Sequence, residues 1–208
     1  MDKQPVLTIV AGANGSGKTT FAIPYTSAIG VQFINADELT KEFEQKGEQN
    51  AMMKGGREFF RLLNQALAKK EDVCIETTLS GTYTTKVMRK AKSLGYQVRM
   101  IYIFLNNAEQ CVARVALRVS KQGHHVPEED IKRRFYRSID NFRDNFMHDL
   151  DVWYLYYNGR KRHELVASFE KGELAITNQV YLQYLQNIKT DGKIWIIKRS
   201  PVDRSNLR

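Results

Sequence analysis

The chain has 208 residues, a length that suits one domain, or one domain with an elaborated end. Hydrophobic residues make up 42% and charged residues 26% of the chain, which is ordinary for a globular protein and excludes global disorder. Lys and Arg number 32 against 23 Asp and Glu, and the net charge of +9 favours polyanionic ligands: nucleic acid, nucleotides, phosphorylated metabolites or an acidic protein.

Strands and helices are predicted to alternate along most of the chain. Strands are expected at 6–11, 31–36, 72–78, 97–105 and 151–157, with a short hairpin at 165–169 and 173–176. Helices are expected from Lys18, at roughly 38–47, 50–69, 83–93 and 107–122, and from Pro127 as a first helical residue. This alternation predicts an α/β fold over 1–208, in which a central parallel sheet is covered by helices on both faces.

Two amphipathic helices, together spanning roughly 107–147, flank a glycine-containing loop. Their apolar faces comprise Ala108, Val112, Val115 and Val119 in the first helix and Ile131, Phe135, Ile139, Phe142 and Phe146 in the second. Five basic side chains flank the loop between them: Arg114, Arg118, Arg133, Arg134 and Arg137. Because guanidinium groups bind phosphate oxygens bidentately, we interpret the two helices as a mobile lid. The alternative is a solvated basic surface.

The sequence favours a reduced, cytoplasmic protein without membrane contact. The longest dense apolar stretch, 100–105, is far shorter than the ~18 residues of a transmembrane helix. Residues 1–5 lead straight into a strand, without the apolar core of a signal peptide. Cys74 and Cys111 are too few for a disulfide framework and lack metal-ligand spacing, so we expect both in the core.

A glycine-rich loop after the first strand carries the strongest functional signal. It comprises Gly12, Ala13, Asn14, Gly15, Ser16, Gly17, Lys18, Thr19 and Thr20, and matches G-x-x-x-x-G-K-[ST] between a strand and a helix. Glycines let successive backbone N–H groups converge on phosphates, and the helix N-terminus adds partial positive charge. Lys18 is expected to reach the β- and γ-phosphates, and the Thr19 hydroxyl to bind Mg²⁺. The sequence therefore predicts a P-loop that binds a nucleoside triphosphate.

Other features narrow the class of P-loop protein. Leu79-Ser-Gly81 resembles the start of a transporter-ATPase signature, but only three residues match and they come too early. The fourth strand ends in Asn106-Asn107, rather than in the Asp-Glu typical of hydrolysing ATPases, and GTPase motifs are missing. The kinase type of P-loop domain remains, with a basic lid and a carboxylate that activates the acceptor.

Two carboxylates are predicted to lie beside the P-loop. Asp37 follows the second strand, in Asn35-Ala-Asp37, and Glu76 ends the third strand, in Glu76-Thr-Thr78. Ligands of parallel sheets bind beyond the carboxyl ends of the strands, so both acids are expected at this edge. Asp37 can accept the proton of an attacking hydroxyl, or it can cap a helix. Glu76 suits a polar acceptor, or it can pair with a nearby basic residue.

Two further features carry weaker signals. His124 and His125 could be a metal pair, but no other His or Cys lies near them in sequence, which favours simple loop residues. The tail 189–208 has six basic and two acidic residues: Lys189, Lys193, Lys198, Arg199, Arg204 and Arg208 against Asp191 and Asp203. It is either a polyanion-binding segment or a solvated C-terminus.

Taken in order, these motifs resemble the compact branch of the zeta-toxin family of P-loop kinases. The resemblance covers about residues 5–160 and depends on five segments: 12–20, 35–37, 76–81, 114–118, and 123–127 with Arg133-Arg134. It implies an adenylate-kinase-like core that uses ATP and Mg²⁺ to phosphorylate a sugar hydroxyl of UDP-N-acetylglucosamine. An antitoxin protein is implied as a partner.

The resemblance also implies roles for individual residues. Lys18 and Thr19 match the nucleotide loop, with Thr19 at the metal, and Asp37 matches the catalytic base. The acceptor is expected at Asn35, Asp37, Glu76 and Thr78. Arg118 and one of Arg133 and Arg134 match the arginines of the lid. Two other functions stay open: a kinase of a nucleoside, antibiotic or nucleic-acid end, and a non-catalytic ATP-binding switch.

Overall fold

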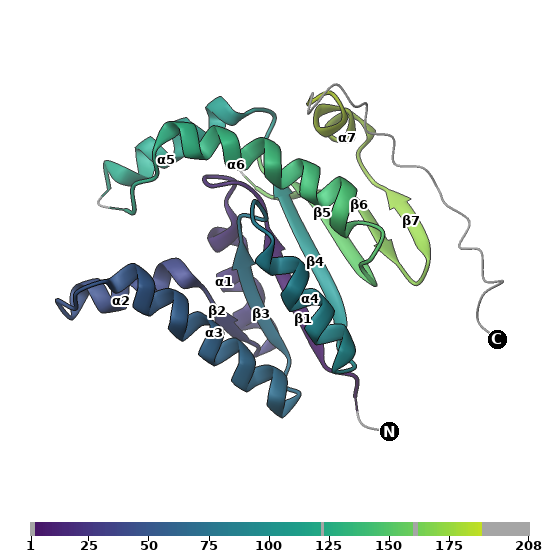
Figure 1. The fold of residues 1–208 in the computed structure, drawn as a ribbon. Helices are drawn as coiled ribbons and strands as arrows, with labels where there is room; N and C mark the ends of the chain where they lie inside the picture. The colour runs from purple at the N-terminus through teal and green to yellow at the C-terminus, as the bar shows by residue number, and fades with distance from the viewer. Residues whose placement is uncertain (1–2, 122, 160–161, 189–208) are drawn as a thin grey trace.

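The computed structural model describes residues 3–121, 123–159 and 162–188, which form one mixed sheet with helices on both faces (Figure 1). The sheet has seven strands in the order β2-β3-β1-β4-β5-β6-β7. Five strands run parallel, and β6 and β7 are antiparallel additions beside β5. The strands are β1 Val6–Ala11, β2 Gln32–Ile34, β3 Val73–Thr77, β4 Gln97–Phe104, β5 Val152–Tyr157, β6 Glu164–Glu170 and β7 Glu173–Ile176.

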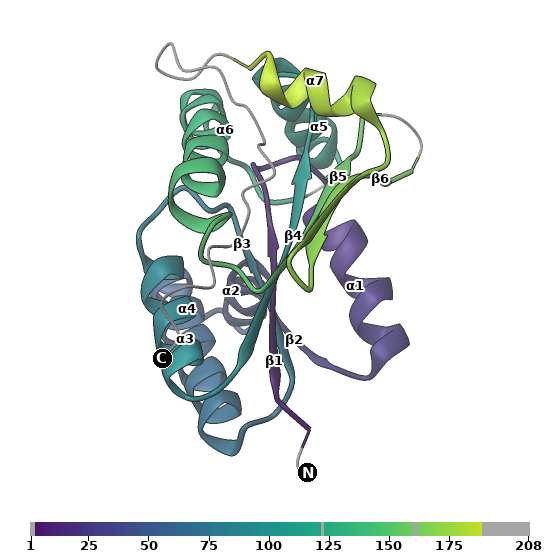
Figure 2. The same cartoon turned by 90° about the vertical axis from the view of Figure 1, so that its right-hand side faces the viewer.

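The helices form a layer on each side of the sheet, which confirms the predicted α/β fold. They are α1 Lys18–Ile29, α2 Ala36–Gln45, α3 Ala51–Lys69, α4 Tyr83–Ser93, α5 Ala108–Val119, α6 Glu128–Asn141 and α7 Gln179–Gln186. Figure 2 shows α1 on one face of the sheet and α3, α4 and α6 on the other. Strand periodicity explains the two layers, because Leu7 and Ile9 of β1 face the larger core whereas Val10 packs on the α1 side.

Two helix starts differ from the sequence expectation. Helix α2 begins at Ala36, and Asn35 is its N-cap, with its Oδ1 accepting hydrogen bonds from the backbone N of Asp37 (2.8 Å) and Glu38 (3.4 Å). Asp37 therefore does not cap this helix, and its carboxylate is free for another role. Pro127 is the N-cap residue of α6 rather than its first helical residue.

Aromatic packing attaches the arginine-bearing helix α6 to the sheet. The π-helix Phe142–Phe146 continues α6, and Phe142 stacks on Tyr102 of β4 with ring centroids 4.5 Å apart. Phe142 also meets the ring of Trp153 in β5 edge-on, and the Tyr102 hydroxyl lies 3.0 Å from the Ser138 hydroxyl. Both rings of the stack are fully buried. These contacts fix the C-terminal part of α6 and the π-helix against the face of β4 and β5.

The sequence also led to expectations about the cysteines, membrane-spanning helices and the basic tail. Both cysteines are buried, as predicted. In the described ranges, none of the helices is long and apolar enough to cross a bilayer. The basic tail 189–208 lies outside the described residues.

The buried cysteines give a direct test of this core. Cys74 and Cys111 are fully buried, and burial raises the pKa of each thiol to about 12. We expect neither thiol to react with Ellman's reagent at pH 8 in the native protein, and two thiols per chain to react after unfolding in guanidinium. Rapid reaction of either thiol in the folded protein would contradict this packing.

Candidate active site

The P-loop follows β1 and is shaped by three glycines with positive φ. Gly12, Gly15 and Gly17 have φ angles of 143°, 80° and 95°. A side chain at Gly12 would collide with the carbonyl oxygen of Ile103, and one at Gly15 would lie 2.6 Å from that of Cys111. Backbone conformation and close packing therefore both require glycine in this loop. The loop leads directly into α1, which begins at Lys18.

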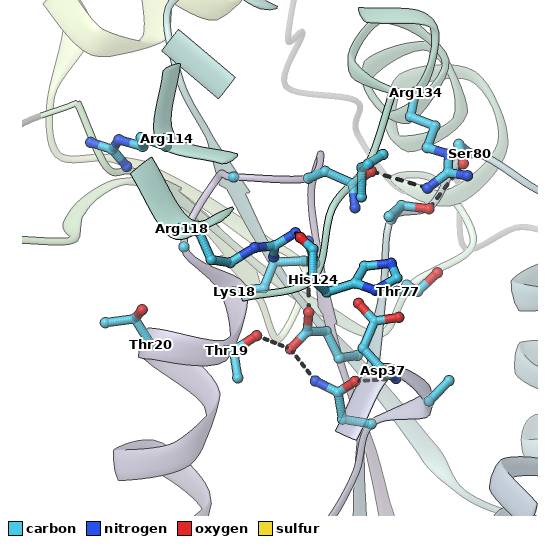
Figure 3. Close-up of a pocket in the computed structure, with 18 of the residues that line it drawn as sticks. Lys18, Thr19, Thr20, Asp37, Thr77, Ser80, Arg114, Arg118, His124 and Arg134 are labelled. Carbon is cyan, nitrogen blue, oxygen red and sulfur yellow. Dashed lines mark hydrogen bonds and ion pairs between the residues drawn. The ribbon is translucent and has the colours of Figure 1, made fainter. Parts of the chain in front are cut away.

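A cavity of about 740 Å³ lies between the P-loop, the ends of β2 and β3, and the segment from α5 to α6. Most of the predicted site residues line it: Asn14, Gly15, Gly17, Lys18, Thr19, Thr20, Asn35, Asp37, Glu76, Thr78, Arg118, Arg133 and Arg134. Gly12, Ala13 and Ser16 belong to the loop but do not line the cavity. Figure 3 shows Thr19 and Asp37 on the sheet side of this pocket, with Arg118, His124 and Arg134 on the lid side.

The carboxylate of Glu76 lies against the P-loop. Its Oε2 accepts hydrogen bonds from the Thr19 hydroxyl (2.8 Å) and the Asn35 amide (3.0 Å), and its Oε1 lies 3.7 Å from the Lys18 ammonium. Burial raises the pKa of Glu76, and the charge of Lys18 opposes that rise. The alternative raised by the sequence, a pairing of Glu76 with a basic residue, is therefore present. Lys18 also donates to the carbonyl oxygen of Ala13, at 2.9 Å.

Asp37 and Thr78 both line the cavity, but they differ in the hydrogen bonds of their side chains. Asp37 is exposed in the first turn of α2, and its carboxylate has no hydrogen-bond partner within the described part of the chain. The Thr78 hydroxyl lies 2.9 Å from that of Ser80. The Thr77 hydroxyl has a structural role, because it accepts a hydrogen bond from the backbone N of Leu79 at 3.0 Å. Asp37 therefore presents to the cavity a carboxylate that is unpaired among the described residues.

The lid arginines do not all face the cavity in the same way. Both arginines pair with Asp130, but Arg134 is half-buried and also donates to the Asn14 side chain of the P-loop (3.3 Å), whereas Arg133 is more exposed. Both line the cavity, but only Arg134 contacts the P-loop. The sequence alone could not predict which of the two adjacent arginines contacts the P-loop. Arg114 lines the cavity as well, while Arg137 does not.

Arg118 is held by the loop that follows its helix. Its Nη2 donates to the carbonyl oxygen of His124 (2.7 Å), and its Nε is buried without a hydrogen-bond partner among the described residues. Gly123 packs on the Arg118 side chain so closely that a Cβ there would collide with its Cγ. The loop therefore holds the guanidinium through Nη2 and leaves its buried Nε–H without a partner among the described residues.

The loop between α5 and α6 carries the two histidines that the sequence raised as a candidate metal pair. His124 lines the cavity and His125 does not. Across the described ranges, no three His, Cys, Asp or Glu side chains are grouped so that they could hold a metal ion. The simpler interpretation, loop residues of the lid, fits the structure.

Asn158 and Ser80 also line the cavity, and neither was predicted as a site residue from the sequence. Asn158 directly follows the fifth strand, so the rule that placed Asp37 and Glu76 at the carboxyl edge of the sheet would also have found it.

Comparison with known proteins agrees with this arrangement. The family model described as Zeta toxin matches residues 1–166. The chain belongs to the zeta-toxin family. An uncharacterized protein of Haemophilus influenzae is 31% identical over 124 residues, which are 60% of this chain and 88% of that protein.

Two solved structures share the fold of this zeta-toxin family member. AvrRxo1-ORF1, in a complex with AvrRxo1-ORF2 and ATP, superposes with a TM-score of 0.69 and 20% identity over 88% of this chain. The PezAT toxin–antitoxin system of Streptococcus pneumoniae gives a TM-score of 0.62 and 18% identity over 89% of this chain. The matches cover 64% and 78% of those chains, so this chain spans just under two thirds of the AvrRxo1 chain. The P-loop kinase-type fold is confirmed.

The contact between Gly123 and Arg118 predicts the effect of one methyl group. Gly123→Ala should displace the Arg118 guanidinium and lower the rate of ATP turnover about tenfold or more, with little change in melting temperature. Turnover assays and thermal melts measure the two effects. Gly56→Ala is the matched control, because a Cβ at this helical position meets nothing within 4 Å. Equal turnover in both variants would contradict the proposed contact.

Proposed function

We propose that this protein is an ATP-dependent kinase that transfers the γ-phosphoryl group to a hydroxyl of a small-molecule acceptor. The observation that carries the proposal is one cavity that contains a P-loop lysine, a free carboxylate and lid arginines: Lys18, Asp37, Arg118 and Arg134. Zeta-toxin family membership and a P-loop kinase-type fold support a phosphotransferase. ATP is supported by the P-loop geometry and by the ATP complex of AvrRxo1-ORF1.

The residues around Thr19 fit Mg²⁺. The Thr19 hydroxyl and the Glu76 carboxylate, whose oxygens lie 2.8 Å apart, are hard oxygen donors of the kind this ion prefers. They would hold Mg²⁺ together with phosphate oxygens and water, and the bound ion supplies charge neutralisation to the phosphates. Lys18 reaches the same phosphates from the first turn of α1. Glu76 thus belongs to the nucleotide side of the site as much as to the acceptor side.

Asp37 acts as the base in this proposal. Its carboxylate takes the proton of the acceptor hydroxyl as that oxygen bonds to the γ-phosphorus. The bond between the γ-phosphorus and the bridging oxygen breaks at the same time, and ADP leaves with the bridging oxygen. Arg118 and Arg134 stabilise the charge on the transferring group from the lid side.

The proposed acceptor is a hydroxyl-rich sugar nucleotide, of which UDP-N-acetylglucosamine is the candidate from the family resemblance. Thr78 and Ser80 line the same cavity as Asp37 and offer hydroxyl groups, which suits hydrogen bonding to sugar hydroxyls. An antitoxin partner is also proposed, because the similar structures include a toxin–antitoxin system and the AvrRxo1-ORF1:ORF2 complex.

The test of this function is a panel of acceptors with ATP and Mg²⁺. We expect UDP-N-acetylglucosamine to be phosphorylated, as followed by mass spectrometry, in preference to nucleosides, aminoglycosides and 5′-hydroxyl oligonucleotides. Lys18→Ala should abolish transfer with the fold intact, because its charge contacts the transferring phosphates. Transfer only to an oligonucleotide or a nucleoside would assign another acceptor. ATP binding without any transfer would favour a switch protein.

Asp37→Asn tests the base. The amide cannot take a proton, so acceptor phosphorylation should fall by about 10²-fold or more while the affinity for ATP changes little. Glu38→Gln removes the same charge from the same helical turn but does not line the cavity, so it should retain the wild-type rate. Should ATP affinity collapse with Asp37→Asn, Asp37 would be a ligand of the metal–nucleotide complex instead of the base.

A further inference from the structure

Two side chains from the β5–β6 connection hold the outer side of the P-loop. The Asn158 amide donates from Nδ2 to the carbonyl oxygen of Ser16 at 2.8 Å, and this hydrogen bond is buried. The Nε2 of His163 lies 3.2 Å from the carbonyl oxygen of Gly17. A Cβ on Gly17 would collide with the Asn158 amide and lie 3.2 Å from His163 Nε2. The two side chains thus pack directly on consecutive peptide groups of the loop.

Asn158 is itself fixed from two directions. Its backbone N donates to the carbonyl oxygen of Phe104 in β4 (3.0 Å), and its carbonyl oxygen accepts from Nη2 of Arg114 in α5 (2.6 Å). The side chain is buried. Asn158 thus joins helix α5, the sheet and the P-loop through its hydrogen bonds. Arg114 and Asn158 both line the cavity.

His163 is suited to donate this hydrogen bond. Burial lowers the pKa of its imidazole, so the ring is neutral near pH 7, and the contact with a carbonyl oxygen places the proton on Nε2. The ring also meets that of Phe21 edge-on, with centroids 5.3 Å apart, which fixes its orientation.

The direction of these carbonyl groups determines where the next N–H groups point. In a planar trans peptide, the C=O and the following N–H point to opposite sides. The carbonyl oxygen of Ser16 points to Asn158, and that of Gly17 points to His163 and also accepts a hydrogen bond from the backbone N of Phe21 in α1 at 3.1 Å. The N–H groups of Gly17 and Lys18 therefore point to the opposite side of their peptide planes. In a P-loop these are donors to phosphate oxygens.

We propose that Asn158 and His163 are positioning residues of the nucleotide site. They hold two peptide planes so that the N–H groups of Gly17 and Lys18 are oriented for the phosphates before the nucleotide binds. This inference rests on the proposed function in one respect, that the P-loop binds ATP. Such contacts form in both the ground state and the transition state, so their loss weakens ATP binding without slowing the transfer step.

The test compares variants that keep or lose each donor. Asn158→Asp has the same shape but places a carboxylate oxygen against the Ser16 carbonyl, and it should weaken ATP binding by about tenfold or more. Asn64→Asp is the matched control, because Asn64 lies exposed on α3 away from the cavity. His163→Ala should weaken ATP binding, and His163→Gln should restore much of it because its amide can donate from a similar position.

Calorimetry with ATP and steady-state kinetics provide the measurements. We expect a raised Kd and KM for ATP, with kcat, the KM for the acceptor and the melting temperature close to wild type. Wild-type ATP affinity in Asn158→Asp and His163→Ala would overturn this inference and leave the proposed function intact. So would a lowered melting temperature with unchanged ATP affinity, since that is a purely structural role. A wild-type protein that binds no ATP would overturn the proposed function and the inference together.

Discussion

The arrangement of the site depends on the hydrogen bonds and the ion pair of the Glu76 carboxylate, which is largely buried. It joins three segments that are distant in sequence: the start of α1 through Lys18 and Thr19, the start of α2 through Asn35, and the end of β3. Burying a carboxylate costs free energy unless the group is paired and hydrogen-bonded. Glu76 meets both conditions, because Lys18 pairs with it and Thr19 and Asn35 donate hydrogen bonds to it. Because Asn35 also caps α2, the same network sets where that helix starts and so where Asp37 stands.

The two helices interpreted as a lid are held differently, by a side-chain hydrogen bond to the backbone and by aromatic stacking. Arg118 is held against the loop that follows α5, and α6 is attached to the sheet by the stack of Phe142 on Tyr102. The two helices therefore have different attachments to the rest of the structure, in addition to their contact with each other. The connection to the P-loop passes through Arg134 and Asn14 on one side and through Arg114 and Asn158 on the other.

Local patterns predicted most of the fold and part of the site. The P-loop, Asp37 and the paired helices of the lid were recognisable because spacing and residue type determine them within short segments. The contacts of the Glu76 side chain could not be predicted in the same way. A strand pattern places a residue at one edge of the sheet, but it does not say which of several neighbours the side chain contacts. The same limit left Arg133 and Arg134 undistinguished. Helix α7 was missed, since a short segment of eight residues carries little periodic signal.

The antiparallel hairpin beside β5 has a consequence for how small this fold can be made. A fragment that ends after β5 would retain the complete glycine-rich motif, the lid and the carboxylates. It would lack Asn158 and His163, and the pairing of Tyr157 with Glu164 that closes the β5–β6 connection would be absent. The carbonyl groups of Ser16 and Gly17 would then have weaker support. If Asn158 and His163 position the P-loop as proposed, a minimal nucleotide-binding unit must extend at least to His163, directly before β6 and beyond the last element that carries a recognisable motif.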